Sequence, residues 1–321
     1  MPVMCERGNN KLTSRYTVQV SEPVLAGHFP GFPIFPGVCL IECVHLTALA
    51  AIADAAGGGV SHRLSGIESA RFLRPVFPGD EVRTEVSVSR EAEGDWLCHG
   101  RTEAGGADTG VFRLRYREEA VAVPGTAVLE VAVPEVAVLE VAAIKRLLPH
   151  RFPMLLIDRV TGIRPGESLV AEKAVTAGEP WYEGLADDAD HAYPPVLLAE
   201  SWCQAAGVLA CLGQPNPDVL TGRVTLFGSI RKMEFPRAVY PGDVVEHTVR
   251  MARMVSDSAA LEGESRRGGE VVLRVGLILI ALRPAGSLGA GLVTVKEGLW
   301  RWRAGKWRWS AVVHAASAVP S

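Results

Sequence analysis

Two kinds of side chain in this sequence are suited to moving protons, and one backbone group is suited to stabilising negative charge on an oxygen atom. His28 stands in a Gly- and Pro-rich loop, GHFPG, and an imidazole exchanges protons near neutral pH. Glu42 and Glu200 each stand in a long apolar segment, where burial raises the pKa of a carboxyl group or requires a partner for it. Gly37 follows Pro36 at the start of the first apolar segment, so its backbone N–H can stabilise an oxyanion. Together these groups predict general acid–base chemistry.

Each of these residues also has a purely structural interpretation. His28 would then be a loop histidine bonded to the backbone. The two glutamates would lie on exposed first turns, where a carboxylate complements the helix dipole. Gln204 lies one helical turn after Glu200, where its amide either orients the carboxyl group or is satisfied by nearby backbone. Burial and side-chain partners distinguish the two sets of interpretations.

The elements that hold these residues are present twice in the chain. FLRPVFPGDEVRTEV (residues 72–86) recurs as FPRAVYPGDVVEHTV (235–249), at an offset of 163 residues. Upstream, FPGVCLIECVHLTALAA (35–51) matches YPPVLLAESWCQAAGVL (193–209) at an offset of 158 residues, which aligns the two glutamates. Two landmarks at nearly the same offset indicate tandem copies of one fold.

Each copy combines one apolar segment with several strands. Residues 38–53 and 196–213 are predicted to be helices by their length and their Ala, Leu and Cys content, and a helix that is apolar on all sides is a buried one. Short segments between turn residues predict strands over residues 16–20, 81–89, 96–103, 110–117, 169–175, 244–253, 258–265 and 270–282. The fold class is therefore α+β, with an antiparallel sheet wrapped around one long buried helix in each copy.

The composition divides the chain into four regions. We expect a first domain at residues 1–120, an Ala/Val/Pro/Glu linker at 121–142, a second domain at 143–284 and a Trp- and Arg-containing tail at 285–321. The tail is expected to be an extension without a function, or an amphipathic strand that docks on a partner or a membrane surface.

The overall composition excludes several classes of protein. A net charge of −3 with 21% charged residues argues against a disordered chain and against nucleic-acid binding. Apolar runs such as residues 271–282 are shorter than the roughly 18–20 residues of a membrane span, and no signal peptide is evident, so we expect a cytoplasmic protein without stable membrane insertion. Six cysteines without a CxxC pair are expected to be reduced and to bind no metal.

Four segments carry a resemblance to a known family. They are AGHFPGFPIFPGVCLIE (26–42) in the first copy and LLPHRFPMLLIDRV (147–160), AEKAVTAGEP (171–180) and LLAESWCQAAGVL (197–209) in the second. The chain resembles the hot-dog-fold 3-hydroxyacyl-[acyl carrier protein] dehydratases of fatty-acid synthesis, the FabZ/FabA family, over roughly residues 12–118 and 143–283. The first copy lacks the LPHR segment of that family.

This resemblance implies a double hot-dog fold with a composite site. In the family, one unit supplies a histidine and a glycine, and the facing unit supplies the acid. By analogy, His28 would remove the proton at C2 of a 3-hydroxyacyl thioester, Glu200 would protonate the leaving hydroxyl at C3, and the N–H of Gly37 would polarise the thioester carbonyl. Glu rather than Asp at this helix position is similar to the branch that dehydrates without isomerising the double bond.

The second composite site is expected to be degenerate. It would pair Glu42 with a loop whose histidine position is Leu185 and whose glycine position is Pro195, which has no N–H. His191 in this loop is six residues from the motif position and is not expected to replace the missing base. Bulky residues are expected to fill this side: Trp181, Tyr182 and Tyr193.

The resemblance also implies the partners of the protein. No cofactor or metal is needed, and the substrate is carried on the phosphopantetheine of an acyl carrier protein, in fatty-acid or polyketide assembly. Basic residues near the PGD motifs would attract that acidic carrier, or are simply solvated: Arg71, Arg74, Arg231, Lys232 and Arg237. A homodimer of double hot-dogs is left open. The rival functions are a non-catalytic acyl-binding subunit and, less consistent with the HFPG motif, a hot-dog thioesterase.

Overall fold

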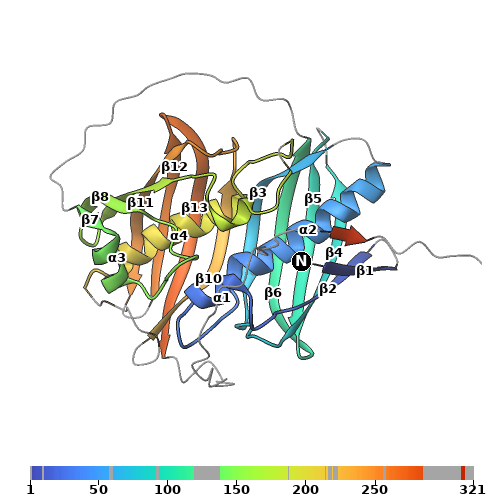
Figure 1. Cartoon of the computed structure of the whole chain (residues 1–321), viewed down its shortest axis with the longest axis horizontal. Helices are drawn as coiled ribbons and strands as arrows, with labels where there is room; N and C mark the ends of the chain where they lie inside the picture. The colour runs from blue at the N-terminus through green and yellow to red at the C-terminus, as the bar shows by residue number, and fades with distance from the viewer. Residues whose placement is uncertain are drawn as a thin grey trace, which may run out of the picture.

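A computed structural model shows two similar halves side by side, each with one long helix against a shared sheet (Figure 1). The structure describes residues 2–8, 11–57, 61–91, 94–118, 138–186, 188–213, 215, 219, 223–255, 258–284 and 312–314.

The first half is built from β1 (Pro2–Gly8), β2 (Lys11–Thr17), α1 (Pro23–Gly27), α2 (Gly37–Ala56), β3 (His62–Phe72), β4 (Glu81–Arg90), β5 (Trp96–Ala104) and β6 (Ala107–Glu118). The second half contains β7 (Leu139–Glu140), α3 (Val141–Leu147), β8 (Arg159–Arg164), β9 (Ser168–Ala174), the short 3₁₀ helix η2 (Pro180–Tyr182), α4 (Pro195–Cys211), β10 (Arg223–Glu234), β11 (Val244–Val255), β12 (Ser258–Arg267) and β13 (Glu270–Pro284).

The strands of the two halves form one continuous sheet. Its order is β14-β1-β2-β4-β5-β6-β3-β10-β13-β12-β11-β9-β8-β7. The halves join where β3 pairs antiparallel with β10, with Ala70 opposite Ile230 and Gly66 opposite Glu234. The α+β double hot-dog class is confirmed. The prediction missed β3 and β10 themselves and treated the two sheets as separate.

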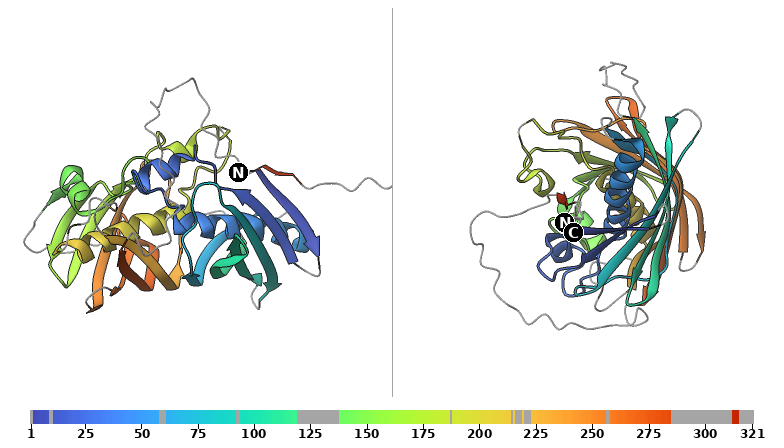
Figure 2. Two further views of the ribbon diagram at one scale, coloured as in Figure 1. Left: turned by 90° about the horizontal axis from the view of Figure 1, so that it is seen from below. Right: turned by 90° about the vertical axis from the view of Figure 1, so that its right-hand side faces the viewer.

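Helix α4 and the N-terminal part of α2 are buried because the curved sheet wraps around them (Figure 2), whereas the last turn of α2 is exposed. Helix α2 contacts β2, β4 and β5, and α4 contacts β9, β11 and β12; the two helices also contact each other. Helix α2 begins after Pro36 and ends at Gly57, whose φ of 76° is the left-handed conformation that commonly terminates a helix. Every residue of α4 from Val196 to Cys211 is buried.

Helix α2 corrects one argument made from the sequence. Its 20 residues have the length and mean hydropathy of a membrane-spanning helix. The length of the apolar runs therefore does not exclude a membrane-spanning helix. In the fold, Val38, Ile41, Val44 and Ile52 are buried. Packing against the sheet and α4 accounts for the apolar character of this helix.

The predicted linker and tail lie mostly outside the described residues. The second half already begins at β7 and α3, which occupy residues 139–142 of the segment predicted as linker. From the tail, the structure describes β14 (Val312–His314), which pairs parallel with β1. The Trp/Arg repeat at residues 299–309 lies outside the described residues.

The cysteines agree with a reduced protein. Those whose side chains are described are free and buried: Cys39, Cys43, Cys98, Cys203 and Cys211. Each therefore acts as a small apolar side chain in the core.

Helix α2 packs closely on the sheet at Gly100. A Cβ atom on this β5 residue would overlap the side chain of Val44 on α2. We expect Gly100→Ala to lower the free energy of unfolding by about 1–3 kcal/mol, the usual cost of overpacking. Urea denaturation measures this change. Gly178→Ala is the matched control, since a Cβ there meets nothing within 4 Å. An equal effect of the two substitutions would contradict the predicted packing.

Candidate active site

His28 is positioned by the end of α1 and by the loop that follows. The helix ends at Gly27, and His28 is its C-cap residue. The side chain is 8% exposed, and its ring stacks on that of Phe29 with the centroids 4.0 Å apart. Nδ1 lies 2.9 Å from the carbonyl oxygen of Ile34. Because a carbonyl only accepts, Nδ1 carries the hydrogen and Nε2 is the basic nitrogen.

The second half of the protein packs directly onto this segment. The backbone N–H of Arg151 donates to the carbonyl oxygen of Gly27 at 3.0 Å. A Cβ atom on Gly27 would overlap the carbonyl oxygen of Arg151 and lie 2.9 Å from the backbone nitrogen of Met154. Glycine at this position therefore permits the close approach that brings the LPHR loop of the second half beside His28.

Glu200 lies near the start of α4 and is 1% exposed, so the exposed interpretation of this residue is wrong. The amide of Gln204, one turn later, donates to Oε1 of Glu200 at 3.0 Å. The same amide donates to the carbonyl oxygen of Met154 at 2.6 Å, and its oxygen accepts from the N–H of Leu156 at 2.8 Å. Both interpretations of Gln204 hold, because this amide binds the backbone and the carboxyl group together.

His150 is the residue that the sequence analysis missed. Its Nε2 lies 3.4 Å from Oε1 of Glu200, and its ring lies edge-on to that of His28 with the centroids 5.3 Å apart. Ligand-type atoms of His28, His150 and Glu200 all lie within 4.8 Å of one another. The sequence signal for His150 is the LLPHR segment, one of the segments that carry the family resemblance.

The electrostatics of this cluster differ from the expectation for Glu200. Burial, followed by the neighbouring His150, lowers the pKa of His28 to about 4, so this imidazole is a neutral base at neutral pH. For Glu200, burial favours the protonated form, but His150 and His28 outweigh it and the pKa falls below its ordinary value. Of the two outcomes expected for a buried carboxyl group, Glu200 therefore shows the second: it has a partner, and its pKa is not raised.

Two histidines and a carboxylate are also a set of groups that divalent transition metals bind. The expectation that the protein uses no metal or cofactor stays a prediction.

Gly37 is the first residue of α2, so its N–H is among those without an acceptor inside the helix. A Cβ atom here would lie 3.0 Å from Cε1 of Phe72, which indicates that the helix start packs closely on β3. The contact of this N–H with a substrate carbonyl stays a prediction.

The second half presents different groups at the corresponding positions. Leu185 is 37% exposed, and Pro195 is the first residue of α4. Nδ1 of His191 is 2.7 Å from the carbonyl oxygen of Ala189 in its own loop. Glu42 is 9% exposed, which excludes the exposed interpretation here too. Three bulky residues on this side are buried: Trp181, Tyr182 and Tyr193. That they fill the second site stays a prediction.

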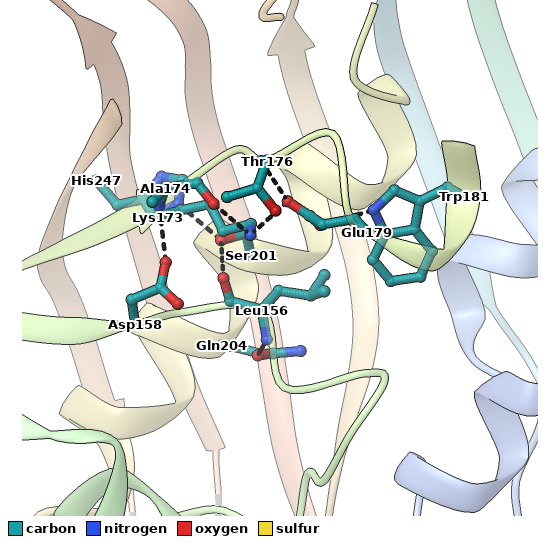
Figure 3. A network of polar contacts seen from close by, with 10 residues as sticks. All are labelled: Leu156, Asp158, Lys173, Ala174, Thr176, Glu179, Trp181, Ser201, Gln204 and His247. Atoms are coloured by element: carbon teal, nitrogen blue, oxygen red, sulfur yellow. Dashed lines mark hydrogen bonds and ion pairs between the residues drawn. The ribbon is translucent and has the colours of Figure 1, made fainter. Parts of the chain in front are cut away.

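A buried polar network fixes the loop that carries Trp181 (Figure 3). One carboxylate oxygen of Glu179 accepts from Nζ of Lys173 at 2.9 Å, and the other accepts from the indole N–H of Trp181 at 2.7 Å. Lys173 is 6% exposed and also donates to the carbonyl oxygen of Ala174. A buried ion pair with these added hydrogen bonds holds the indole in one orientation.

Comparison with known proteins matches each half separately. A family model described as the ApeI dehydratase, ApeI-like, matches residues 4–104, and a FabA-like domain model matches residues 148–275. Over 130 residues, 40% of this chain, the sequence is 37% identical to a 3-hydroxyacyl-[acyl-carrier-protein] dehydratase FabZ of Campylobacter curvus, of which it covers 87%. A FabZ of Shewanella sp. strain W3-18-1 is 39% identical over 128 residues, with 82% of that protein covered.

Solved structures resemble the whole tandem arrangement. The dehydratase domain of RzxB from Pseudomonas fluorescens superposes with a TM-score of 0.57 at 17% identity, covering 84% of this chain and 94% of that domain. The dehydratase domain of PpsC from Mycobacterium tuberculosis gives 0.57 at 14% identity, with 87% and 97% covered. These likenesses support the double hot-dog fold, and the sequence identities place the chain in a family: it belongs to the FabZ family of 3-hydroxyacyl-[acyl-carrier-protein] dehydratases.

Proposed function

We propose that this protein dehydrates 3-hydroxyacyl thioesters to trans-2-enoyl thioesters, in fatty-acid or polyketide assembly. The observation that carries the proposal is that His28 of the first half and Glu200 of the second lie within 4.8 Å of each other in a buried cluster. A base and an acid at this separation can act on adjacent carbons of one acyl chain.

The proposed reaction uses the two side chains and one backbone group. Nε2 of His28 removes a proton from C2, while the N–H of Gly37 stabilises the negative charge that develops on the thioester oxygen. The hydroxyl at C3 leaves as water after it receives a proton through Glu200. Gln204 keeps the carboxyl group in place, because its amide is anchored to two backbone groups of the adjoining loop.

The substrate carrier in this proposal is an acyl carrier protein, as in the names of the FabZ relatives. The phosphopantetheine arm would bring the thioester to Gly37, and the reaction draws on no cofactor of the enzyme. The cytoplasmic location expected from the sequence belongs to the same proposal. Among the basic residues considered for carrier binding, Arg237 forms an ion pair with Glu270 at 3.5 Å, which leaves less of its charge for an acidic partner.

The second side has no catalytic role in this proposal. Leu185 cannot accept a proton, and the nitrogen of Pro195 has no hydrogen to donate. Glu42 therefore remains as a buried carboxyl group, and burial raises its pKa to about 7. The rival interpretation is an acyl-binding subunit that supports a separate dehydratase, which the altered second half favours.

Unequal roles of the two glutamates give the kinetic prediction. With a 3-hydroxyacyl-[acyl carrier protein] as substrate, we expect Glu200→Gln to lower kcat by roughly 10²–10⁴-fold, the contribution of a positioned acid. Glu42→Gln should keep the wild-type rate to within about twofold, because Leu185 and Pro195 stand where the corresponding base and N–H donor would be. Mass spectrometry of the carrier follows the loss of one water per acyl group.

Two outcomes of this measurement would contradict the proposal. Equal losses for both variants would show that the second side is also catalytic. A wild-type protein that retains the acyl carrier but never removes water would favour the acyl-binding subunit.

The raised pKa of Glu42 predicts a pH dependence of stability. The folded state holds the Glu42 proton more tightly than the unfolded chain does, so this contribution is fully present below the unfolded pKa of 4.5 and is lost as pH rises to about 7. Glutamine has no proton to lose. The stability of Glu42→Gln relative to wild type should therefore rise between pH 4.5 and 7, by at most about 3–4 kcal/mol at about 1.4 kcal/mol per pKa unit.

Urea denaturation at pH 4.5 and at pH 8 measures this difference. Glu81→Gln is the control, since the side chain of Glu81 is 52% exposed. A stability difference between Glu42→Gln and wild type that is the same at both pH values would show that Glu42 has no raised pKa.

A further inference from the structure

His150 combines burial with unused hydrogen-bonding capacity. The residue is 6% exposed, and neither Nδ1 nor Nε2 has a hydrogen bond of good geometry among the described residues. Nε2 nevertheless lies 3.4 Å from Oε1 of Glu200, within ion-pair distance. Buried polar atoms in native proteins nearly always have partners, so an imidazole left in this state points to a role with the substrate or with a proton.

Few groups face this imidazole. Among the described residues, the ring of His28 lies edge-on to it, the ring of Phe29 packs edge-on with the centroids 4.9 Å apart, and the carboxyl group of Glu200 lies within ion-pair distance. The titratable groups around His150 are therefore the proposed base and the proposed acid. Its place between them suits the transfer of a proton from one to the other.

We propose that His150 stores the proton that Glu200 passes to the leaving hydroxyl, and that it later takes back the proton that His28 removes from the substrate. This inference rests on the dehydration proposed above. His150 acts through Glu200 and is in that sense a positioning residue.

The proton count closes over one catalytic cycle. In the proposed cycle the stored proton starts on His150, with His28 neutral and Glu200 ionised. The proton of C2 moves to His28 as the C2–C3 double bond forms, and the C3–O bond breaks as the hydroxyl takes a proton from Glu200, which takes one from His150. The proton on His28 then passes to His150, which restores the starting state. One hydrogen and one hydroxyl have left the substrate as water.

The charge state of Glu200 supports this assignment. Although burial favours its protonated form, the adjacent imidazoles lower the pKa of Glu200, so the carboxyl group is ionised at neutral pH. An ionised carboxylate has no proton of its own to give. The proton must come from a neighbour, and His150 is the imidazole placed at 3.4 Å.

A pair of conservative variants tests the proposal. His150→Gln keeps a donor of similar size beside Glu200 but cannot carry a proton. We expect its kcat to fall by roughly 10- to 100-fold, less than the loss of the acid itself. In a Glu200→Gln background the same change should cost less than about twofold, since groups that act as one unit are not additive. His99→Gln, on the exposed side of β5, is the control and should leave kcat unchanged.

Chemical rescue separates proton transfer from packing. His150→Ala opens a space that imidazole can enter, and added imidazole should restore at least about tenfold of the lost kcat. Pyrazole has the same ring size but is far less basic, so it should restore almost nothing.

The outcomes that would overturn the proposal are distinct from a failure of the proposed function. Wild-type kcat in His150→Gln would overturn it, as would equal rescue by imidazole and pyrazole, or an additive loss in the Glu200→Gln background. If His150→Ala does not fold, the kcat values of His150→Gln and of the His150→Gln/Glu200→Gln double variant still test the proposal. A wild-type protein that removes no water would reject the dehydration itself.

Discussion

The antiparallel pairing of β3 with β10 is the constraint on which the rest of the structure depends. It joins two sheets into one and fixes the halves in a single relative position. The guanidinium group of Arg63 reinforces the junction, because it donates to the carbonyl oxygens of Phe235 and Pro236 in the other half. The proposed site takes its base and its acid from different halves and needs such a rigid junction, since a displacement of about 1 Å can cost 10²-fold in rate.

Once the halves are fixed, two equivalent carboxyl groups meet different environments. Glu200 lies next to His150 and Gln204, and its pKa is lowered. Glu42 is buried on the corresponding helix, and its pKa is raised to about 7. Desolvation acts on both residues, so the difference comes from the neighbouring groups. The same helix position therefore holds a carboxyl group with a lowered pKa on one side and one with a raised pKa on the other.

The second half has kept the scaffold while changing its loop. The loop that corresponds to the His28 segment lacks both the base and the N–H donor. Its bulky residues are buried instead, and the network of Lys173, Glu179 and Trp181 holds that segment firmly. This second half still supplies Glu200, Gln204 and His150 to the first. In the proposed function, each half therefore contributes residues to the same composite site.

The sequence by itself determined the duplication, the two buried helices and the identity of His28, Glu200 and Gly37 as candidates. These features depend on residue type, local periodicity and repeat spacing, all of which are present in the amino-acid sequence. The loss of a base at Leu185 and of an N–H at Pro195 is equally visible from residue type alone.

Only the tertiary structure decided the junction and the full set of site residues. Strand β3 was missed because bulges between Leu64 and Gly66 and between Ile67 and Ser69 break its alternation of buried and exposed residues. His150 was missed for a different reason. Its loop is held against α4 by the bonds of Gln204 to Met154 and Leu156, and against the His28 segment by the bond of Arg151 to Gly27, all contacts between segments far apart in the chain. Local patterns carry no information on such a distance, and the protonation of a buried group depends on those neighbours.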